Sequence, residues 1–138
     1  MELDPAEARR RFAAARVARL ATASGGGVPH LVPVTFVLDG DTVYFAVDHK
    51  PKSTWQLRRL RNIRENDHVA LLADHYSDDW SALWWVRADG TAELVEDDAR
   101  RARSVAGLQA RYAQYRGRPP QGPVVAVTVN RWSGWSFS

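Results

Sequence analysis

Three short segments near the N-terminus carry the pattern that most restricts the fold. Residues 17–24, 29–39 and 42–48 are rich in β-branched and aromatic side chains, and apolar and polar residues mostly alternate along them. Such alternation is typical of β-strands with one buried face. The glycine-containing stretches between them, 24–27 and 39–41, suit hairpin turns, because glycine readily adopts positive φ. The pattern therefore predicts an antiparallel meander of three strands.

The remainder of the chain alternates between helix-like and strand-like patterns. Asp4 is a suitable N-cap and Pro5 a suitable first residue for a helix near the N-terminus. Apolar residues at i, i+3 and i+6 (Leu57, Leu60 and Ile63) mark the buried side of a second helix. Beyond the meander, the predicted elements are helices at 3–15, 53–66 and 96–116 and strands at 68–74, 82–95 (with a bulge near Asp89 and Gly90) and 124–137.

Six predicted strands with short connections and few crossovers favour a mainly β (α+β) fold, an antiparallel barrel with helices at its ends. The sequence contains no internal repeat and no linker long enough to divide it, so residues 1–138 are expected to form a single domain. A chain of this length buries one core but has little surface to spare for a closed cofactor pocket. A partner subunit is therefore expected to complete such a pocket.

Composition excludes several classes of site. The chain has no cysteine, which excludes disulfides, thiolate catalysis and cysteine-ligated metals, and favours a reducing cytoplasm. Its N-terminus lacks the apolar stretch of a signal peptide, and no run approaches the roughly 18 apolar residues of a membrane span. We therefore expect a soluble cytoplasmic protein. Asp78 and Asp79 indicate a polar loop or cap more than paired catalytic carboxylates. No metal site is predicted, because the histidines lack ligand spacing: His30, His49, His68 and His75.

The only two lysines of the chain lie between a predicted strand and a predicted helix. Lys50 and Lys52 are two residues apart, so they project to one side of an extended segment. Ser53 and Thr54 follow as candidate N-caps, where the first free N–H groups of a helix form a positive end. This combination suits a phosphate, and Arg58 would extend the positive surface. Solvated surface charges beside an ordinary N-cap remain the alternative. ATP is not expected, because the segment lacks the glycines of a P-loop.

Residues 11–138 closely resemble the pyridoxamine-5′-phosphate-oxidase-like split β-barrel proteins. They are most similar to the actinobacterial subgroup described as probable coenzyme F-420-dependent oxidoreductases. The segments specific to this subgroup are DHKPK, DHYSDDW and WWVRADGTA, whereas LAT followed by G-x-P belongs to the wider superfamily. The resemblance implies a six-stranded split barrel with flanking helices. It also implies a homodimer with a flavin or deazaflavin in a groove between the subunits, its phosphate at the strand-to-helix corner.

The resemblance also implies which residues contact the cofactor, but it supplies no general acid or base, so catalytic residues are unknown. For each tryptophan concerned, structural packing remains the alternative to a wall of the cofactor site. The resemblance implies Lys50, Lys52 and Ser53 at the phosphate, with Thr54 as a weaker candidate. Pro51, between the lysines, and Arg58, from the charge pattern, complete the candidate phosphate-binding residues. The residues implied to lie along the ring system are Pro33, Val34 and Thr35, largely through backbone groups, and Trp84, Trp85 and Trp135.

The activity implied by this resemblance is hydride transfer from coenzyme F-420, a deazaflavin, to an unsaturated small organic acceptor. A deazaflavin of this type carries a phosphate and an anionic oligoglutamate tail, and FMN carries no such tail, so the arginines favour the deazaflavin. Two alternatives stay open: an FMN-dependent or pyridoxal-phosphate-using oxidase of the same fold, and a non-catalytic cofactor carrier. A net charge of only +3 and the lack of a recognised nucleic-acid motif argue against nucleic acid.

Overall fold

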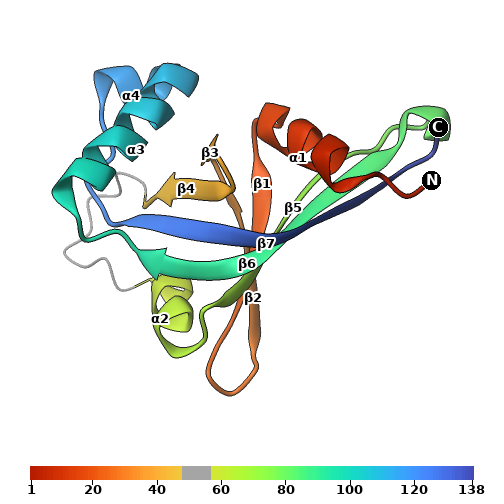
Figure 1. Cartoon of the computed structure of the whole chain (residues 1–138). Coiled ribbons are helices and arrows are strands. Elements are labelled where there is room, and N and C mark those ends of the chain that lie inside the picture. Colours follow the sequence, from red (N-terminus) through yellow and green to blue (C-terminus); the bar gives the residue numbers. More distant parts are fainter. Residues whose placement is uncertain (48–56) are drawn as a thin grey trace.

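The computed structural model describes residues 1–47 and 57–138. In that part of the chain, the helices and strands are arranged around one sheet (Figure 1). In chain order the elements are α1 (Pro5–Ala14), β1 (Ala18–Ala23), β2 (Pro29–Val34), β3 (Val37–Asp39), β4 (Thr42–Ala46), α2 (Arg58–Glu65), β5 (His68–His75), the 3-10 helix η1 (Trp80–Ala82), β6 (Trp84–Leu94), α3 (Asp98–Arg111), α4 (Ala113–Gly117) and β7 (Val124–Ser136).

The described strands form one seven-stranded sheet in the order β2-β1-β5-β6-β7-β4-β3, with antiparallel neighbours throughout. Strands β2 and β3 lie at opposite ends of this order, yet only Thr35 and Phe36 connect them. Three Cα–Cα steps span at most about 11 Å. The two edges of the sheet must therefore approach each other at this link, which makes the sheet a half-barrel with its mouth beside Thr35.

The mainly β class with flanking helices is confirmed, but the predicted number of six strands is wrong. The segment predicted as one strand, 29–39, contains two strands, β2 and β3, which lie on opposite edges of the sheet. Alternating burial continues through the break, because Val34 and Phe36 are both buried and Thr35 between them is half-buried. Periodicity reports which face of a strand is buried and not which strand it pairs with. A change of partner within one apolar run therefore leaves the pattern intact.

Both predicted hairpin turns and the predicted bulge are confirmed. Gly27 in the β1–β2 turn has a φ of 85°, and Gly40 in the β3–β4 turn has a φ of 62°. The register of β6 against β7 shifts between Asp89 and Gly90, which leaves Asn130 of β7 unmatched. A bulge of this kind bends a strand pair and increases its twist. The long β6–β7 ribbon can therefore follow the curl of the half-barrel.

The main core fills the inside of the half-barrel. Helix α1 packs on β6 and β7, α2 packs on β1 and β6, and α3 packs on β3 and β4 (Figure 1). Among the described residues, no helix is both long and apolar enough to cross a bilayer. The largest core side chains, each exposed by 1% or less, include Phe12, Leu20, Phe36, Phe45, Leu60 and Leu71.

Helix α1 begins as its sequence predicts. The Asp4 carboxylate accepts hydrogen bonds from the backbone N–H groups of Ala6 and Glu7. One turn further, Glu7 pairs with Arg10 at 2.6 Å and with Arg11 at 2.7 Å. Hydrogen bonds from these two guanidinium groups lower the pKa of Glu7 from 4.5 to about 2. The helix is thus stabilised by an N-cap and by a charge-assisted pair.

A Glu7→Gln variant is expected to be less stable than the unsubstituted protein at neutral pH and to differ little from it in stability at pH 2. Because the pKa of Glu7 is depressed in the folded chain, the stabilisation is complete above pH 4.5 and is lost as the pH falls towards about 2. Urea denaturation of both proteins at several pH values would show this. Glu96→Gln is the matched control, since the exposed Glu96 makes no ion pair in the described structure. Equal losses for both variants at neutral pH would contradict the pairing.

The start of α2 differs from the prediction. The helix begins at Arg58, and Leu57 occupies the N-cap position with extended backbone and no side-chain cap. Within the described residues the helix therefore begins later than predicted. Ser53 and Thr54, the predicted N-caps, lie outside the described residues. The later apolar positions of the helix, Leu60 and Ile63, are buried as predicted.

Candidate functional site

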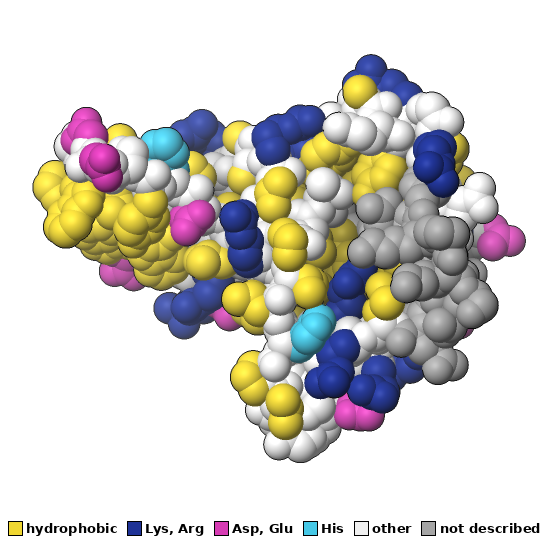
Figure 2. Space-filling view, turned by 180° about the vertical axis from the view of Figure 1, so that it is seen from behind, with side chains coloured by type: hydrophobic (Ala, Val, Ile, Leu, Met, Phe, Trp, Pro, Cys, Tyr) yellow, Lys and Arg dark blue, Asp and Glu magenta, His cyan; other side chains and the backbone are white. Residues whose placement is uncertain are grey.

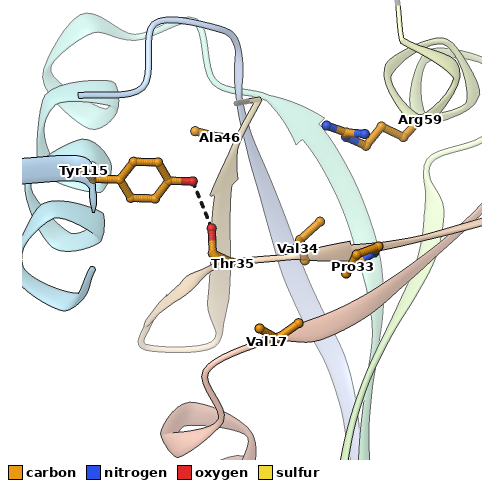
Figure 3. A pocket seen from close by; sticks show the side chains of 7 residues that line it. All are labelled: Val17, Pro33, Val34, Thr35, Ala46, Arg59 and Tyr115. Carbon is orange, nitrogen blue, oxygen red and sulfur yellow. Dashed lines mark hydrogen bonds between the residues drawn. The ribbon is translucent and has the colours of Figure 1, made fainter. Parts of the chain in front are cut away.

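A hollow of about 230 Å³ opens at the mouth of the half-barrel, beside the link between β2 and β3 (Figure 3). We call it the mouth hollow. Four of its residues have small apolar side chains, two carry hydroxyl groups, and one carries a guanidinium. Its lining residues are Val17, Pro33, Val34, Thr35, Ala46, Arg59 and Tyr115.

A break in a helix places Tyr115 at this site. The predicted helix over 96–116 is in fact two helices, because Tyr112 between α3 and α4 has extended backbone with φ −123° and ψ 119°. The chain turns there, and the ring of Tyr115 points from α4 towards Thr35 (Figure 3). The two hydroxyl oxygens lie 2.9 Å apart and share a hydrogen bond. Tyr115 is only 8% exposed and Thr35 is half-buried, so this bond is partly buried.

Strand β2 offers the hollow a backbone edge. Within the described sheet, β2 pairs with β1 on one side and has no strand neighbour on the other. The N–H and C=O groups on that outer edge are not used by a β-ladder. Pro33 fits an edge position, because proline has no N–H to donate. The edge can therefore form hydrogen bonds with the polar rim of a flat ligand.

A larger hollow of about 440 Å³ adjoins the first one. We call it the helix-corner hollow, since it lies against the corner between α3 and α4. It shares Val17, Thr35 and Tyr115 with the mouth hollow and adds Arg16, Tyr112 and Gln114. Small-molecule sites usually enclose about 300–1,000 Å³. The Thr35–Tyr115 hydrogen bond therefore lies on a wall common to two hollows, the larger of which has the size of a ligand site.

The structure brings together only part of the predicted site. Pro33, Val34 and Thr35 line the mouth hollow as a group. Arg58 lies on the exposed side of α2 and does not line it, whereas the next residue, Arg59, does. The predicted phosphate-binding residues Lys50, Pro51, Lys52, Ser53 and Thr54 lie outside the described residues.

The three predicted tryptophans lie towards the other end of the β6–β7 ribbon. On β6, Trp85 directly follows Trp84 in the sequence. Trp85 pairs with Trp135 on β7. Ala46, which lines the mouth hollow, pairs with Val124, eleven residues before Trp135 on β7. At about 3.3 Å per residue, that separation is roughly 35 Å of strand. That separation applies to the Ala46 side of the hollow, because Pro33 is in register, through β1 and β5, with Arg87, two residues from Trp85 and three strands away. None of the three tryptophans is among the lining residues of the mouth hollow, so their contact with the ring stays a prediction.

Sequence reasoning missed Arg59 and Tyr115. Arg59 precedes Leu60 and stands four residues before Ile63, so it lies at the border of the buried face of α2, and this spacing could have identified it. Tyr115 stands three residues after Tyr112, a spacing that places both on one face of a continuous helix. Its direction depends on the break at Tyr112, which no glycine or proline marks.

The acidic loop before β6 has a structural role. The Asp79 carboxylate accepts hydrogen bonds from the backbone N–H of Ser81 at 3.1 Å and from its hydroxyl at 2.6 Å. These bonds lower the pKa of Asp79 and cap η1, as the cap interpretation predicts. Across residues 1–47 and 57–138, no three histidine or acidic side chains are placed to hold a metal ion.

Comparison with known proteins assigns the fold to a family. A profile described as pyridoxamine 5′-phosphate oxidase matches residues 5–136. The chain belongs to this family. The predicted resemblance to it is therefore confirmed at the level of the family. No curated protein matches the sequence.

Solved structures of the same fold extend over almost the whole chain. A FAD-binding protein of Mesorhizobium loti is 20% identical, with a TM-score of 0.74 over 97% of this chain and 95% of that one. A conserved hypothetical protein of Mycobacterium tuberculosis is 19% identical, with a TM-score of 0.79 over 98% and 86%. The haem storage protein HutZ of Vibrio cholerae is 17% identical, with a TM-score of 0.72 over 97% and 95%. At such identities the likeness is one of fold.

Proposed function

We propose that this member of the pyridoxamine 5′-phosphate oxidase family is an oxidoreductase that binds coenzyme F-420 at the mouth hollow and reduces an unsaturated small organic acceptor. The observation that carries the proposal is the mouth hollow itself, in which an edge strand, a hydroxyl pair and a guanidinium meet beside apolar walls. The FAD-binding relative of the same fold supports a flavin-type cofactor.

The side chains present fit a flat redox ring. Val17, Val34 and Ala46 supply apolar surface for the faces of the ring. The outer edge of β2 and the hydroxyl of Thr35 supply polar partners for its rim. Bound reduced deazaflavin would supply the hydride, and the chain would contribute positioning and the exclusion of water.

Positive charge near the mouth hollow supports a cofactor with an anionic tail. Ala46 at the end of β4 and Arg59 at the start of α2 both line the hollow, and the predicted phosphate-binding segment 50–54 connects these two elements in the sequence. Basic side chains gather over α2 (Figure 2). An oligoglutamate tail would gain from this charge beyond what a phosphate gains, and FMN has a phosphate but no such tail. The exposed arginines of α2 are Arg58, Arg61 and Arg64.

We also propose that the cofactor site is completed in a homodimer. Apolar side chains gather at the end of the molecule that carries the chain termini (Figure 2). There Trp80, Trp135 and Phe137 are 67%, 37% and 51% exposed. Exposed apolar patches of this kind mark interaction surfaces, and in the proposed homodimer the partner chain would bring its tryptophans to the hollow. Sedimentation equilibrium should give about twice the 15.5 kDa of one chain.

Fluorescence titration with coenzyme F-420, FMN and haem tests the proposed function. We expect micromolar or tighter binding of coenzyme F-420 and weaker binding of the other two. Binding of FMN or haem without binding of coenzyme F-420 would overturn the cofactor assignment. Oxygen consumption during turnover would favour the FMN-dependent oxidase, because deazaflavins react poorly with oxygen. Tight binding without turnover across enone and quinone acceptors would favour the carrier.

A Lys52→Ala variant is expected to weaken binding of coenzyme F-420 by roughly 1.5–3 kcal/mol, the scale of a lost hydrogen bond to a charged group. The same titration measures this loss. Arg131→Ala is the control, since Arg131 is an exposed cation on β7 away from both hollows. An unchanged dissociation constant for Lys52→Ala would remove this lysine from the phosphate site.

A further inference from the structure

We infer that the helix-corner hollow is a second recognition site, which binds a carboxylate group through Arg16. The inference rests on the proposed function, because the carboxylate would belong either to the organic acceptor or to the oligoglutamate tail of the cofactor. The shared wall with the mouth hollow makes both sources possible geometrically.

Two positively charged side chains, those of Arg16 and Arg111, lie close together at this corner. The guanidinium of Arg16 lies 4.7 Å from the centroid of the Tyr112 ring, and that of Arg111 lies 5.5 Å from the same centroid. Arg16 also donates a hydrogen bond to the backbone carbonyl of Arg111 at 2.8 Å. Burial lowers the pKa of Arg111, and the positive charge of Arg16 lowers it further. A bound anion would relieve this repulsion.

The described residues provide no negatively charged partner at the corner. Within the described part of the chain, neither Arg16 nor Arg111 pairs with a carboxylate, and no lining residue of the helix-corner hollow is acidic. Other arginines in the described part of the chain form ion pairs with acidic side chains at 3.2 Å or less. The arginines paired in this way are Arg9, Arg10, Arg11, Arg87 and Arg100.

Arg111 has a structural role, whereas Arg16 is available to bind a ligand. Arg111 donates to the carbonyl of Ala15 and stacks over Phe36 at 4.7 Å, so it is built into the fold. Arg16 is exposed at the hollow and uses one hydrogen bond to hold its position. A guanidinium has five N–H donors in a planar fork. The remaining donors of Arg16 are therefore held ready to bind both oxygens of a carboxylate.

The position of the hollow connects this site to the chemistry. The wall shared with the mouth hollow contains the hydrogen-bonded hydroxyls of Thr35 and Tyr115. An acceptor bound by its carboxylate at Arg16 extends past these hydroxyls towards the mouth hollow. The same path would lead the glutamate tail of a ring bound at the mouth hollow to Arg16. Both sources place a carboxylate at the same guanidinium.

Calorimetric titration with cinnamate and its neutral isostere cinnamamide tests the site. Arg16→Gln is expected to weaken cinnamate binding about tenfold and to leave cinnamamide binding unchanged, because only the carboxylate pairs with the guanidinium. Arg131→Gln makes the same change in net charge at an exposed position away from the hollow and should change neither. Arg16→Lys retains the charge without the fork and should show an intermediate loss. Circular dichroism confirms that each variant is folded.

Parallel titrations with coenzyme F-420 and with the deazaflavin lacking its glutamates separate the two sources. A loss on Arg16→Gln for cinnamate assigns the site to the acceptor, and a loss only for the glutamate-bearing cofactor assigns it to the tail. No loss for either ligand, or an equal loss with Arg131→Gln, would overturn the carboxylate site. Arg16-dependent cinnamate binding by a protein that binds no deazaflavin would support the site and overturn the proposed cofactor.

Discussion

A Gly90→Ala variant is expected to lose roughly 3 kcal/mol of unfolding free energy. A Cβ atom at this position would lie 2.3 Å from the carbonyl oxygen of Thr128 and 3.1 Å from a methyl carbon of Val127. The first contact is to backbone of the adjacent strand, so it is relieved only if β6 and β7 move apart. Because Gly90 stands at the bulge, that movement would disturb the bend of the ribbon. Urea denaturation measures the loss.

Gly26→Ala is the matched control for this substitution. The nearest atom to a Cβ at Gly26 is the hydroxyl oxygen of Ser24 at 3.8 Å, an ordinary contact, and Gly26 does not have positive φ. Its replacement by alanine should change stability by less than about 1 kcal/mol, since alanine mainly restricts the unfolded chain. If both variants lost the same free energy, steric pressure at the bulge would not be the cause.

The parts of the fold that could be predicted are those with local causes. The φ of Gly27 and Gly40 and the cap at Asp4 are determined by residues within the turn or the first helical turn. The bulge was predicted from the adjacent Asp89 and Gly90, although the contact that excludes a side chain at Gly90 is with Thr128 of the neighbouring strand. The partner change at Thr35 has a non-local cause. It depends on which strands lie across the sheet, and no residue near Thr35 specifies them.

The candidate site also contains some residues that could be predicted from the sequence and some that could not. Pro33, Val34 and Thr35 were implied by the family resemblance, and the structure places them together at one hollow. Arg59 could have been identified from the phase of α2, which Leu60 and Ile63 set, whereas Tyr115 required the break at Tyr112, which no side-chain type marks. The tryptophans looked equivalent to Pro33 in the sequence because each stands in a strand. The register of β7 places Trp135 about 35 Å of strand from the Ala46 side of the hollow, and none of the three tryptophans lines the hollow.

A Phe36→Ala variant is expected to lose about 3–5 kcal/mol of unfolding free energy, the usual range for a buried phenylalanine. Phe36 is fully buried, and its ring centroid lies 4.7 Å from that of Phe12. Its backbone N–H donates to the hydroxyl of Tyr112 at 3.1 Å, which ties the link between the sheet edges to the corner of α3 and α4. Loss of the ring would leave a cavity under Arg111, which stacks on it.

The same variant tests whether the closed mouth of the half-barrel holds the site. Phe36 and Thr35 alone join β2 to β3, so a loosened Phe36 should displace Thr35 from Tyr115 and weaken coenzyme F-420 binding at temperatures where the variant is still folded. Val28→Ala is the control, because Val28 is 55% exposed in the β1–β2 turn, lines neither hollow, and should lose less than about 1 kcal/mol. A folded Phe36→Ala protein with unchanged cofactor affinity would show that the ligand is held by other parts of the chain, and the mouth hollow would then not be its site.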